Sequence, residues 1–128
     1  KTLSERRQLV IGDFENKVKE MLNQLAMESA VLKVELRQLI ELGPSGIDDI
    51  AFLFAANRGS RLQQIKDVAS GGELSRLTLI TKSLVASAIP LPTLVFDEID
   101  SGISGDVALR MGNILRRLSN HHQVVTIT

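Results

Sequence analysis

Apolar positions divide the chain into segments of helical and of strand periodicity. From Ser4 to Met27 apolar side chains recur every three or four residues, the spacing of one face of an α-helix. This stripe is shorter than the three or four heptads that define a coiled coil, so the helix is either the end of a coiled-coil arm or an ordinary docking helix. Its apolar positions are Ile11, Phe14, Val18, Met21 and Leu25.

Two strands are predicted next. Apolar and polar residues alternate from Val31 to Leu39, as in a half-buried strand, and Ile50 to Ala55 is a second candidate. The turn residues of Gly43 to Gly46 lie between them, which favours an antiparallel pair. Asn57 to Gly59 carries the residues of a further turn.

A helical pattern starts at residue 70 and is ended by Pro90 and Pro92. One face of this helix is expected to carry five apolar residues and one threonine. They are Leu74, Leu77, Thr81, Leu84, Val85 and Ala88.

The last part of the chain predicts a β-α-β unit. Thr93 to Phe96 and Val124 to Ile127 are short β-prone runs, and a helical pattern from Asp106 to Leu118 lies between them. Such runs are typical of parallel strands buried on both faces. Ligands bind such sheets at the carboxyl ends of the strands, where Asp97 and Glu98 lie.

Composition limits the possible functions. The chain has 128 residues, enough for one α/β domain with a core, and it has no cysteine, which excludes disulfides and thiolate chemistry. No apolar run is long enough to span a membrane and no signal peptide is visible, so a soluble protein without membrane contact is expected. Fifteen basic residues balance fifteen acidic ones, and aromatic residues make up 3%, so these residues alone form neither a basic nor a stacking surface for DNA.

Ser70-Gly71-Gly72-Glu73 lies at the start of the helix that is predicted from residue 70 onward. Two glycines allow a backbone to approach a ligand closely, and a helix N-terminus attracts anions such as phosphate. The same four residues fit a capping box, in which Ser70 and Glu73 satisfy the first N–H groups of the helix internally. Both interpretations stay open on the tetrapeptide alone.

Asp97 and Glu98 follow an apolar strand directly. One carboxylate at such a place can hold magnesium while its neighbour orients or deprotonates a water. Alternatively, both acids are simply solvated at a strand end. The next residues, Asp100 to Gly105, are either plain turn chemistry or part of the same site. His121 and His122 are expected to be a solvated cap near the end of the last helix.

The order and spacing of the three motifs match one superfamily. Ser70 to Glu73 resembles the signature motif of ABC-type ATPases, Thr93 to Glu98 resembles Walker B with its catalytic glutamate, and Ser101 to Gly105 resembles the D-loop. Within that superfamily, residues 69–76 and 96–105 are similar to the RecN family, bacterial DNA-repair relatives of the SMC proteins. The resemblance covers essentially the whole chain, and residues 66–105 carry most of its specificity.

The resemblance implies an α/β fold. It is the C-terminal lobe of an ABC/SMC-type P-loop ATPase head, a mixed sheet with flanking helices, preceded by the end of a coiled-coil arm. Residues 1–128 would be one domain fragment, with 1–28 as the coiled-coil end or docking helix and 29–128 as the lobe. No glycine is followed by lysine, so Walker A is absent and the chain alone is expected not to hydrolyse ATP. Both ends of the chain are expected to be cut from a longer protein.

The resemblance also implies roles and partners. ATP would be bound with Mg²⁺, with Asp97 contributing to the metal site and Glu98 polarising the attacking water. Ser70, Gly71, Gly72 and Glu73 would contact ATP on a second copy of the head, and Ser101 and Gly102 would couple the two sites. The implied partners are that second copy in an ATP-dependent homodimer, the N-terminal lobe with Walker A, and DNA.

The resemblance implies that the complete protein acts in DNA double-strand break repair and recombination, in the cytoplasm at the nucleoid. Two other functions remain open. One is the head of another SMC-like ATPase in chromosome organisation, and the other is a nonenzymatic interaction module.

Overall fold

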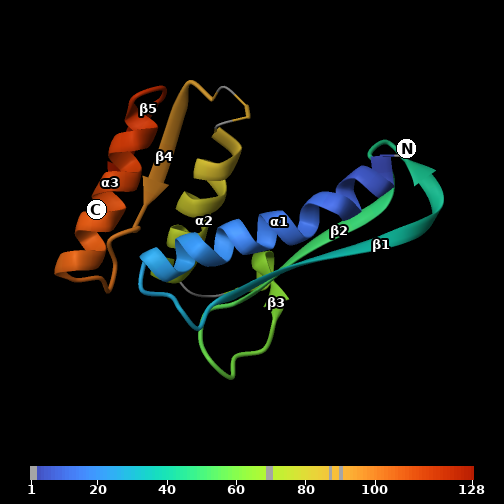
Figure 1. Cartoon of the computed structure of the whole chain (residues 1–128), viewed down its shortest axis with the longest axis horizontal. Helices are drawn as coiled ribbons and strands as arrows, with labels where there is room; N and C mark the ends of the chain where they lie inside the picture. Colours follow the sequence, from blue (N-terminus) through green and yellow to red (C-terminus); the bar gives the residue numbers. More distant parts are fainter. Residues whose placement is uncertain (1–2, 69–70, 87, 90) are drawn as a thin grey trace. The chain divides into compact units, whose positions relative to one another are not determined.

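The chain forms two compact units. The structure, a computed structural model, describes residues 3–68, 71–86, 88–89 and 91–128. One unit is built from residues 1–20 and 29–68, and the other from residues 21–28 and 69–128 (Figure 1). No helix in the described part of the chain is long and apolar enough to cross a membrane.

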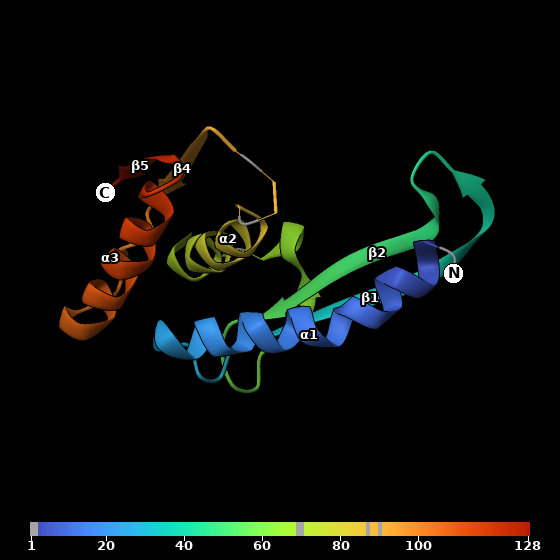
Figure 2. The ribbon, with the colours of Figure 1, turned by 45° about the horizontal axis from the view of Figure 1, so that its top comes forward.

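The first unit is a β-hairpin with a helix along it. Helix α1 (Leu3–Gln24) contributes its first turns, and β1 (Val31–Gly43) pairs antiparallel with β2 (Gly46–Ala55). Figures 1 and 2 both show α1 lying along this hairpin. The predicted helix and antiparallel pair are thereby confirmed, although both strands extend further toward the turn than the alternation indicated.

The remaining elements of this unit are short. Strand β3 (Gln63–Gln64) pairs antiparallel with β2, and η1 (Ile65–Asp67) is one 3₁₀ turn. The predicted turn before them is present, because the Ser60 N–H donates to the Asn57 carbonyl and Gly59 has φ +84°.

Glu15 joins α1 to the outer edge of the hairpin. Its Oε1 accepts the Val34 backbone N–H at 2.8 Å, and its Oε2 accepts from Lys33 Nζ at 2.8 Å. Nearby, the rings of Phe14 and Phe52 meet edge to face with centroids 6.2 Å apart. Burial alone would raise the pKa of Glu15, but the bonds from Lys33 and Val34 lower it below its usual value.

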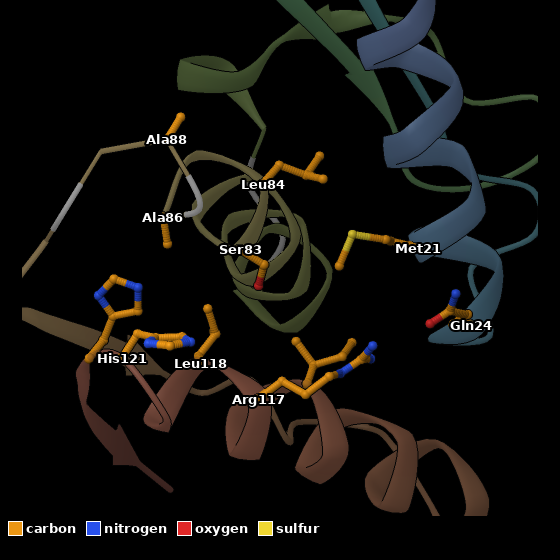
Figure 3. Close-up of a pocket in the computed structure, with 11 residues that line it drawn as sticks. Met21, Gln24, Ser83, Leu84, Ala86, Ala88, Arg117, Leu118 and His121 are labelled. Atoms are coloured by element: carbon orange, nitrogen blue, oxygen red, sulfur yellow. The ribbon is translucent and has the colours of Figure 1, made fainter.

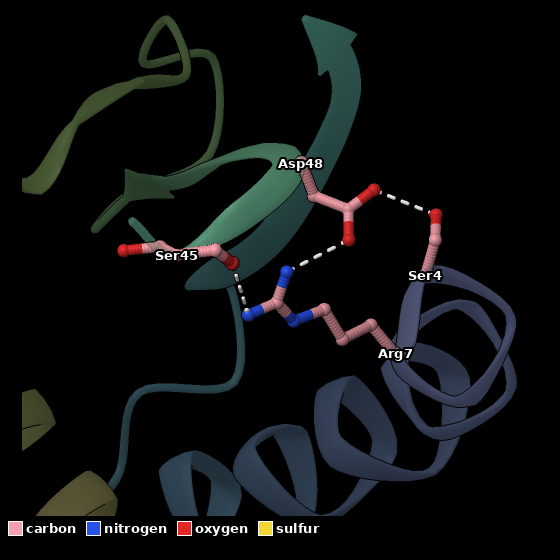
Figure 4. A network of polar contacts seen from close by, with 4 residues as sticks. All are labelled: Ser4, Arg7, Ser45 and Asp48. Carbon is pink, nitrogen blue, oxygen red and sulfur yellow. Dashed lines mark hydrogen bonds and ion pairs between the residues drawn. The ribbon is translucent and has the colours of Figure 1, made fainter. Parts of the chain in front are cut away.

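A second polar cluster fixes the N-terminal end of α1 against the hairpin turn (Figure 4). The Asp48 carboxylate accepts from Ser4 Oγ at 2.6 Å and from Arg7 Nη1 at 2.7 Å. Arg7 Nη2 also donates to the Ser45 carbonyl at 3.1 Å. The Asp48 side chain is 1% exposed, and the bonds from Ser4 and Arg7 hold its pKa below the ordinary range.

The C-terminal end of α1 belongs to the second unit and is closed by a Schellman motif. The Met27 N–H donates to the Leu22 carbonyl at 3.0 Å, and the Ala26 N–H donates to the Asn23 carbonyl at 3.2 Å. Ala26 has φ +55°, in the left-handed region that this motif requires and that glycine usually fills. The backbone at Met27 is therefore fixed by the helix end itself.

The rest of the second unit is the predicted β-α-β unit with a helix before it. Helix α2 (Gly71–Ala86) precedes β4 (Thr93–Asp97), α3 (Gly105–Ser119) and β5 (Gln123–Ile127). Strands β4 and β5 are parallel, which confirms the predicted arrangement. The buried apolar side chains of this unit are Leu22, Leu25, Met27, Leu77, Leu79, Ile80, Ala86, Leu94, Phe96, Ile99, Met111, Ile114 and Leu118.

Two expectations about burial were wrong. Burial of both faces of the parallel strands fails, because Leu94 and Phe96 are buried while Val95 is 49% exposed. Only two strands form this sheet among the described residues, and one face packs on helices while the other is open. The apolar face expected on the helix that starts at residue 70 is also displaced, because Val85 is exposed and Leu79 is buried instead. Helix α2 ends at Ala86, so Ala88 lies in the turn after it and is exposed.

Candidate functional site

The predicted site residues lie in the second unit at two element ends. Gly71, Gly72 and Glu73 form the first turn of α2, and Asp97 is the last residue of β4 with Glu98 directly after it. Ser101 and Gly102 lie in the turn between β4 and α3. Ser70 lies outside the described residues, so its predicted capping and ligand contacts stay predictions.

The structure brings Gly71 and Glu98 together. A Cβ on Gly71 would lie 3.2 Å from Oε2 of Glu98, which is closer than an ordinary van der Waals contact. Both residues are exposed, so solvent or a ligand can reach this point. The signature-like turn and the carboxylate therefore meet within one chain, a contact that the sequence motifs did not predict.

Gly72 makes an even closer approach. A Cβ there would lie 2.9 Å from the Ser101 carbonyl oxygen and 3.1 Å from the Ser101 Cβ. Because the nearer obstacle is backbone, it cannot swing aside as a side chain end would. Glycine at position 72 is required by contact with the D-loop-like turn, independently of any ligand.

Arg76 lies behind these glycines. It is 8% exposed, and its Nη1 donates to the Ser101 carbonyl at 2.8 Å while its Nε donates to Met27 Sδ at 3.4 Å. Burial lowers the pKa of this guanidinium, while the charge of Glu73 opposes the shift. Sequence reasoning missed Arg76; the available signal was a charged residue one turn after Gly72 in an otherwise apolar helix face.

Glu98 has an unusual backbone. Its φ is +52°, in the left-handed region that costs a residue with a Cβ about 1 kcal/mol or more. The surroundings impose this conformation: the Glu98 N–H donates to the Ile127 carbonyl at 3.1 Å, and its own carbonyl accepts from the Ser101 N–H at 3.3 Å. The first bond continues the β4–β5 pairing one residue past Asp97. The backbone from which the Glu98 side chain starts is thus fixed by the sheet and by the turn together.

The two carboxylates suit magnesium in part. Asp97 and Glu98 are exposed and offer oxygen atoms, the ligand type that Mg²⁺ prefers. Among the described residues, no group of three His, Asp or Glu side chains is placed to hold a metal ion. This donor set fits an ion that keeps waters and binds substrate phosphates, as Mg²⁺ usually does.

Lys82 adds a cation on the helix side of β4. Its Nζ donates to the Val95 carbonyl at 3.2 Å and lies 5.3 Å from the centre of the Phe96 ring. These contacts hold α2 on the strand that carries Asp97. They give Lys82 a structural role rather than one at the carboxylates.

A separate pocket of about 570 Å³ lies in the second unit, among the end of α1, α2 and α3 (Figure 3). None of the predicted site residues that the structure describes lines it. His121 and His122 stand at its border, and His122 Nδ1 lies 2.5 Å from the Leu91 carbonyl. The predicted solvated cap describes the exposed His121, whereas His122 is half-buried and bonded to the loop before β4.

Comparison with known proteins finds RecN proteins similar to this chain over most of its length. RecN of Rickettsia prowazekii, described as a DNA repair protein, is 40% identical over 126 residues, covering 98% of this chain and 23% of that protein. RecN of Vibrio cholerae is 41% identical over 112 residues, 87% of this chain and 20% of that protein. This chain is a relative of RecN. It spans about a quarter or less of the RecN proteins that it matches, and no protein-family model matches it.

Solved structures show the fold of this RecN relative. The Smc head domain of Pyrococcus furiosus, crystallised with an extended coiled coil and the C-terminal domain of ScpA, superposes with a TM-score of 0.62 at 18% identity. That match covers 98% of this chain and 30% of the other. The Smc head of Pyrococcus yayanosii gives 0.62 at 20% identity, covering 96% and 22%. The expected α/β fold of an SMC-type head is thereby confirmed.

Proposed function

We propose that this chain is the C-terminal lobe of the ATP-hydrolysing head of a RecN-like DNA double-strand break repair protein. Residues 1–28 would form the arm end and residues 29–128 the lobe. The carrying observation is the exposed junction of three motifs, where Gly71 meets Glu98 and Gly72 meets Ser101. The identity of about 40% to RecN proteins, against 18–20% to SMC heads, favours repair over chromosome organisation.

Each residue has a role in this proposal. Glu98 holds and polarises the water that attacks the γ-phosphate, and its fixed backbone keeps the carboxylate at the strand end. Asp97 contributes to the magnesium site; the ion supplies charge neutralisation on the phosphates. The bound nucleotide itself requires Walker A, which the absent N-terminal lobe would supply.

Ser70, Gly71, Gly72 and Glu73 act on nucleotide held by a second copy of the head. Only a γ-phosphate reaches both heads, so its loss on hydrolysis removes the bridging contacts and the homodimer opens. Ser101 lies beside the signature turn, and Ser101 and Gly102 together would couple the two sites. DNA binding belongs to the complete protein, in the cytoplasm at the nucleoid. Carboxylates at both positions 97 and 98 argue against a module that only binds partners.

A mixture of two full-length variants tests the composite site. Ser70→Arg blocks the signature, and Glu98→Gln removes the base while keeping the shape; each variant alone should be inactive. In an equal mixture half of the dimers are mixed and each rebuilds one site, so about a quarter of the wild-type turnover should return. Absence of recovery, with both variants folded and dimerising, would exclude a site shared in this way.

A further inference from the structure

The bonds of Arg76 join three segments that are distant in the sequence. Its Nη1 donates to the Ser101 carbonyl, and its Nε donates to Met27 Sδ, from a helix position one turn after Gly72. All of these residues belong to the second unit. A guanidinium has donors in fixed directions, so one side chain can hold two acceptors in a defined relation.

The geometry around Ser101 leaves little freedom. A Cβ on Gly72 would lie 2.9 Å from the Ser101 oxygen and 3.2 Å from Arg76 Nη1. The Ser101 oxygen therefore lies in close contact with the first turn of α2 and is also bonded by the Arg76 guanidinium. Only glycine at position 72 leaves room for this arrangement.

The second acceptor is also fixed. Met27 follows the Schellman motif that ends α1, and its N–H is bonded to the Leu22 carbonyl. Met27 is 7% exposed, so its sulfur lies in packed surroundings. Arg76 thus contacts a rigid helix end with one donor and an exposed turn with another.

We infer that Arg76 is a positioning residue that holds the D-loop-like turn at Ser101 against the signature-like turn at Gly72. The two motifs then move as one surface anchored at the end of α1. This inference rests on the proposed function for its consequence in turnover, but the fixing of the turn can be measured without it. Arg76 itself touches no reacting atom.

The test uses the full-length protein with Arg76→Met, Arg76→Lys and Met27→Leu. Arg110→Met is the matched control, because Arg110 is an exposed arginine whose ion pair with Asp106 lies on the surface of α3. Two readouts are taken in parallel: amide hydrogen exchange in residues 101–104, and steady-state ATP hydrolysis. Thermal unfolding reports whether each variant is folded.

For Arg76→Met we expect exchange at residues 101–104 to rise about tenfold or more while β1 and β2 keep their protection. The kcat should fall about tenfold or more with KM for ATP within about twofold, because turnover and not binding needs the turn in place. Arg76→Lys should recover part of both, since an ammonium reaches one acceptor at a time. Met27→Leu should show a smaller effect in the same direction.

Unchanged exchange at residues 101–104 in folded Arg76→Met would overturn the inference. A uniform rise in exchange along the chain, or equal losses in Arg76→Met and Arg76→Lys with a lowered Tm, would also overturn it by giving Arg76 a structural role only. A third outcome separates the two claims. If Arg76→Met raises exchange only at residues 101–104, but the wild-type protein itself hydrolyses no ATP, the positioning role is supported and the proposed function is refuted.

Discussion

Gly71 faces the Glu98 carboxylate so closely that a Cβ would lie 3.2 Å from Oε2. The obstacle is the far end of a flexible side chain, whereas for Gly72 it is the Ser101 backbone. A side chain at position 71 would therefore displace another side chain, whereas one at position 72 would have to move backbone. Alanine substitutions at the two positions should have different effects.

At Gly71, alanine should displace the carboxylate and leave the fold intact. We expect Gly71→Ala to change the free energy of unfolding by no more than about 0.5 kcal/mol, since Glu98 can rotate away. Turnover of the full-length protein should fall, because Glu98 would leave its place at the strand end. Chemical unfolding and steady-state ATP hydrolysis check the two parts. Wild-type turnover in Gly71→Ala would show that the carboxylate position does not matter.

At Gly72, alanine should destabilise the fold itself. The Ser101 carbonyl cannot give way without moving the turn, and such overpacking costs about 1–3 kcal/mol. Gly112 in α3 is the control, because a Cβ there meets nothing within 4 Å. Gly112→Ala should stabilise by about 0.5–1 kcal/mol through helix propensity. Equal effects of the two substitutions in urea unfolding would contradict the close approach.

Asp48 should make stability depend on acid pH. Its pKa is lower in the folded chain than in the unfolded one, because Ser4 and Arg7 bond the ionised form. The stabilisation is therefore complete above the unfolded value of about 3.9 and is lost as the pH falls through the folded value. Unfolding measured across this range should be less pH-dependent for Asp48→Asn. Asp106→Asn, which removes an exposed ion pair, should leave the profile as in wild type.

Ala26 should be improved by glycine. Its left-handed φ of +55° is unfavourable for a residue with a Cβ, so Ala26→Gly is expected to stabilise by about 1 kcal/mol. Ala108, exposed within α3, is the control: Ala108→Gly should destabilise by about the same amount. Thermal unfolding of both variants checks the opposite signs. A loss of stability in Ala26→Gly would show that the end of α1 is not held by its Schellman motif.

Local periodicity predicted the elements well because each one has an apolar face of clear spacing. The spacing from Ile11 to Leu25 indicated α1, and the β-prone runs around α3 indicated a parallel pair. The same reasoning failed for Val95, because burial of the second face depends on a neighbour that no local pattern reveals. Leu79 was missed because α2 is covered on more than one side.

The candidate site was predicted as motifs but not as an arrangement. The sequence indicated Asp97, Glu98 and the glycines by residue type and order. It gave no sign that Glu98 would have φ +52°, because that angle is imposed by a bond to Ile127 in another strand. Arg76 was passed over for a similar reason: its acceptors at Met27 and Ser101 are contributed by segments far away in the chain.

The bond from Val34 to Glu15 also affects how the hairpin meets other chains. Strand β1 is at the edge of its sheet, and an edge strand with free N–H groups invites pairing with a neighbouring molecule. The Glu15 carboxylate occupies one of those donors and places a negative charge beside it. The hairpin tip is apolar and open to solvent, with Ile40 fully exposed and Leu42 82% exposed. The Glu15 carboxylate therefore disfavours intermolecular β-sheet growth along the strand that carries this tip.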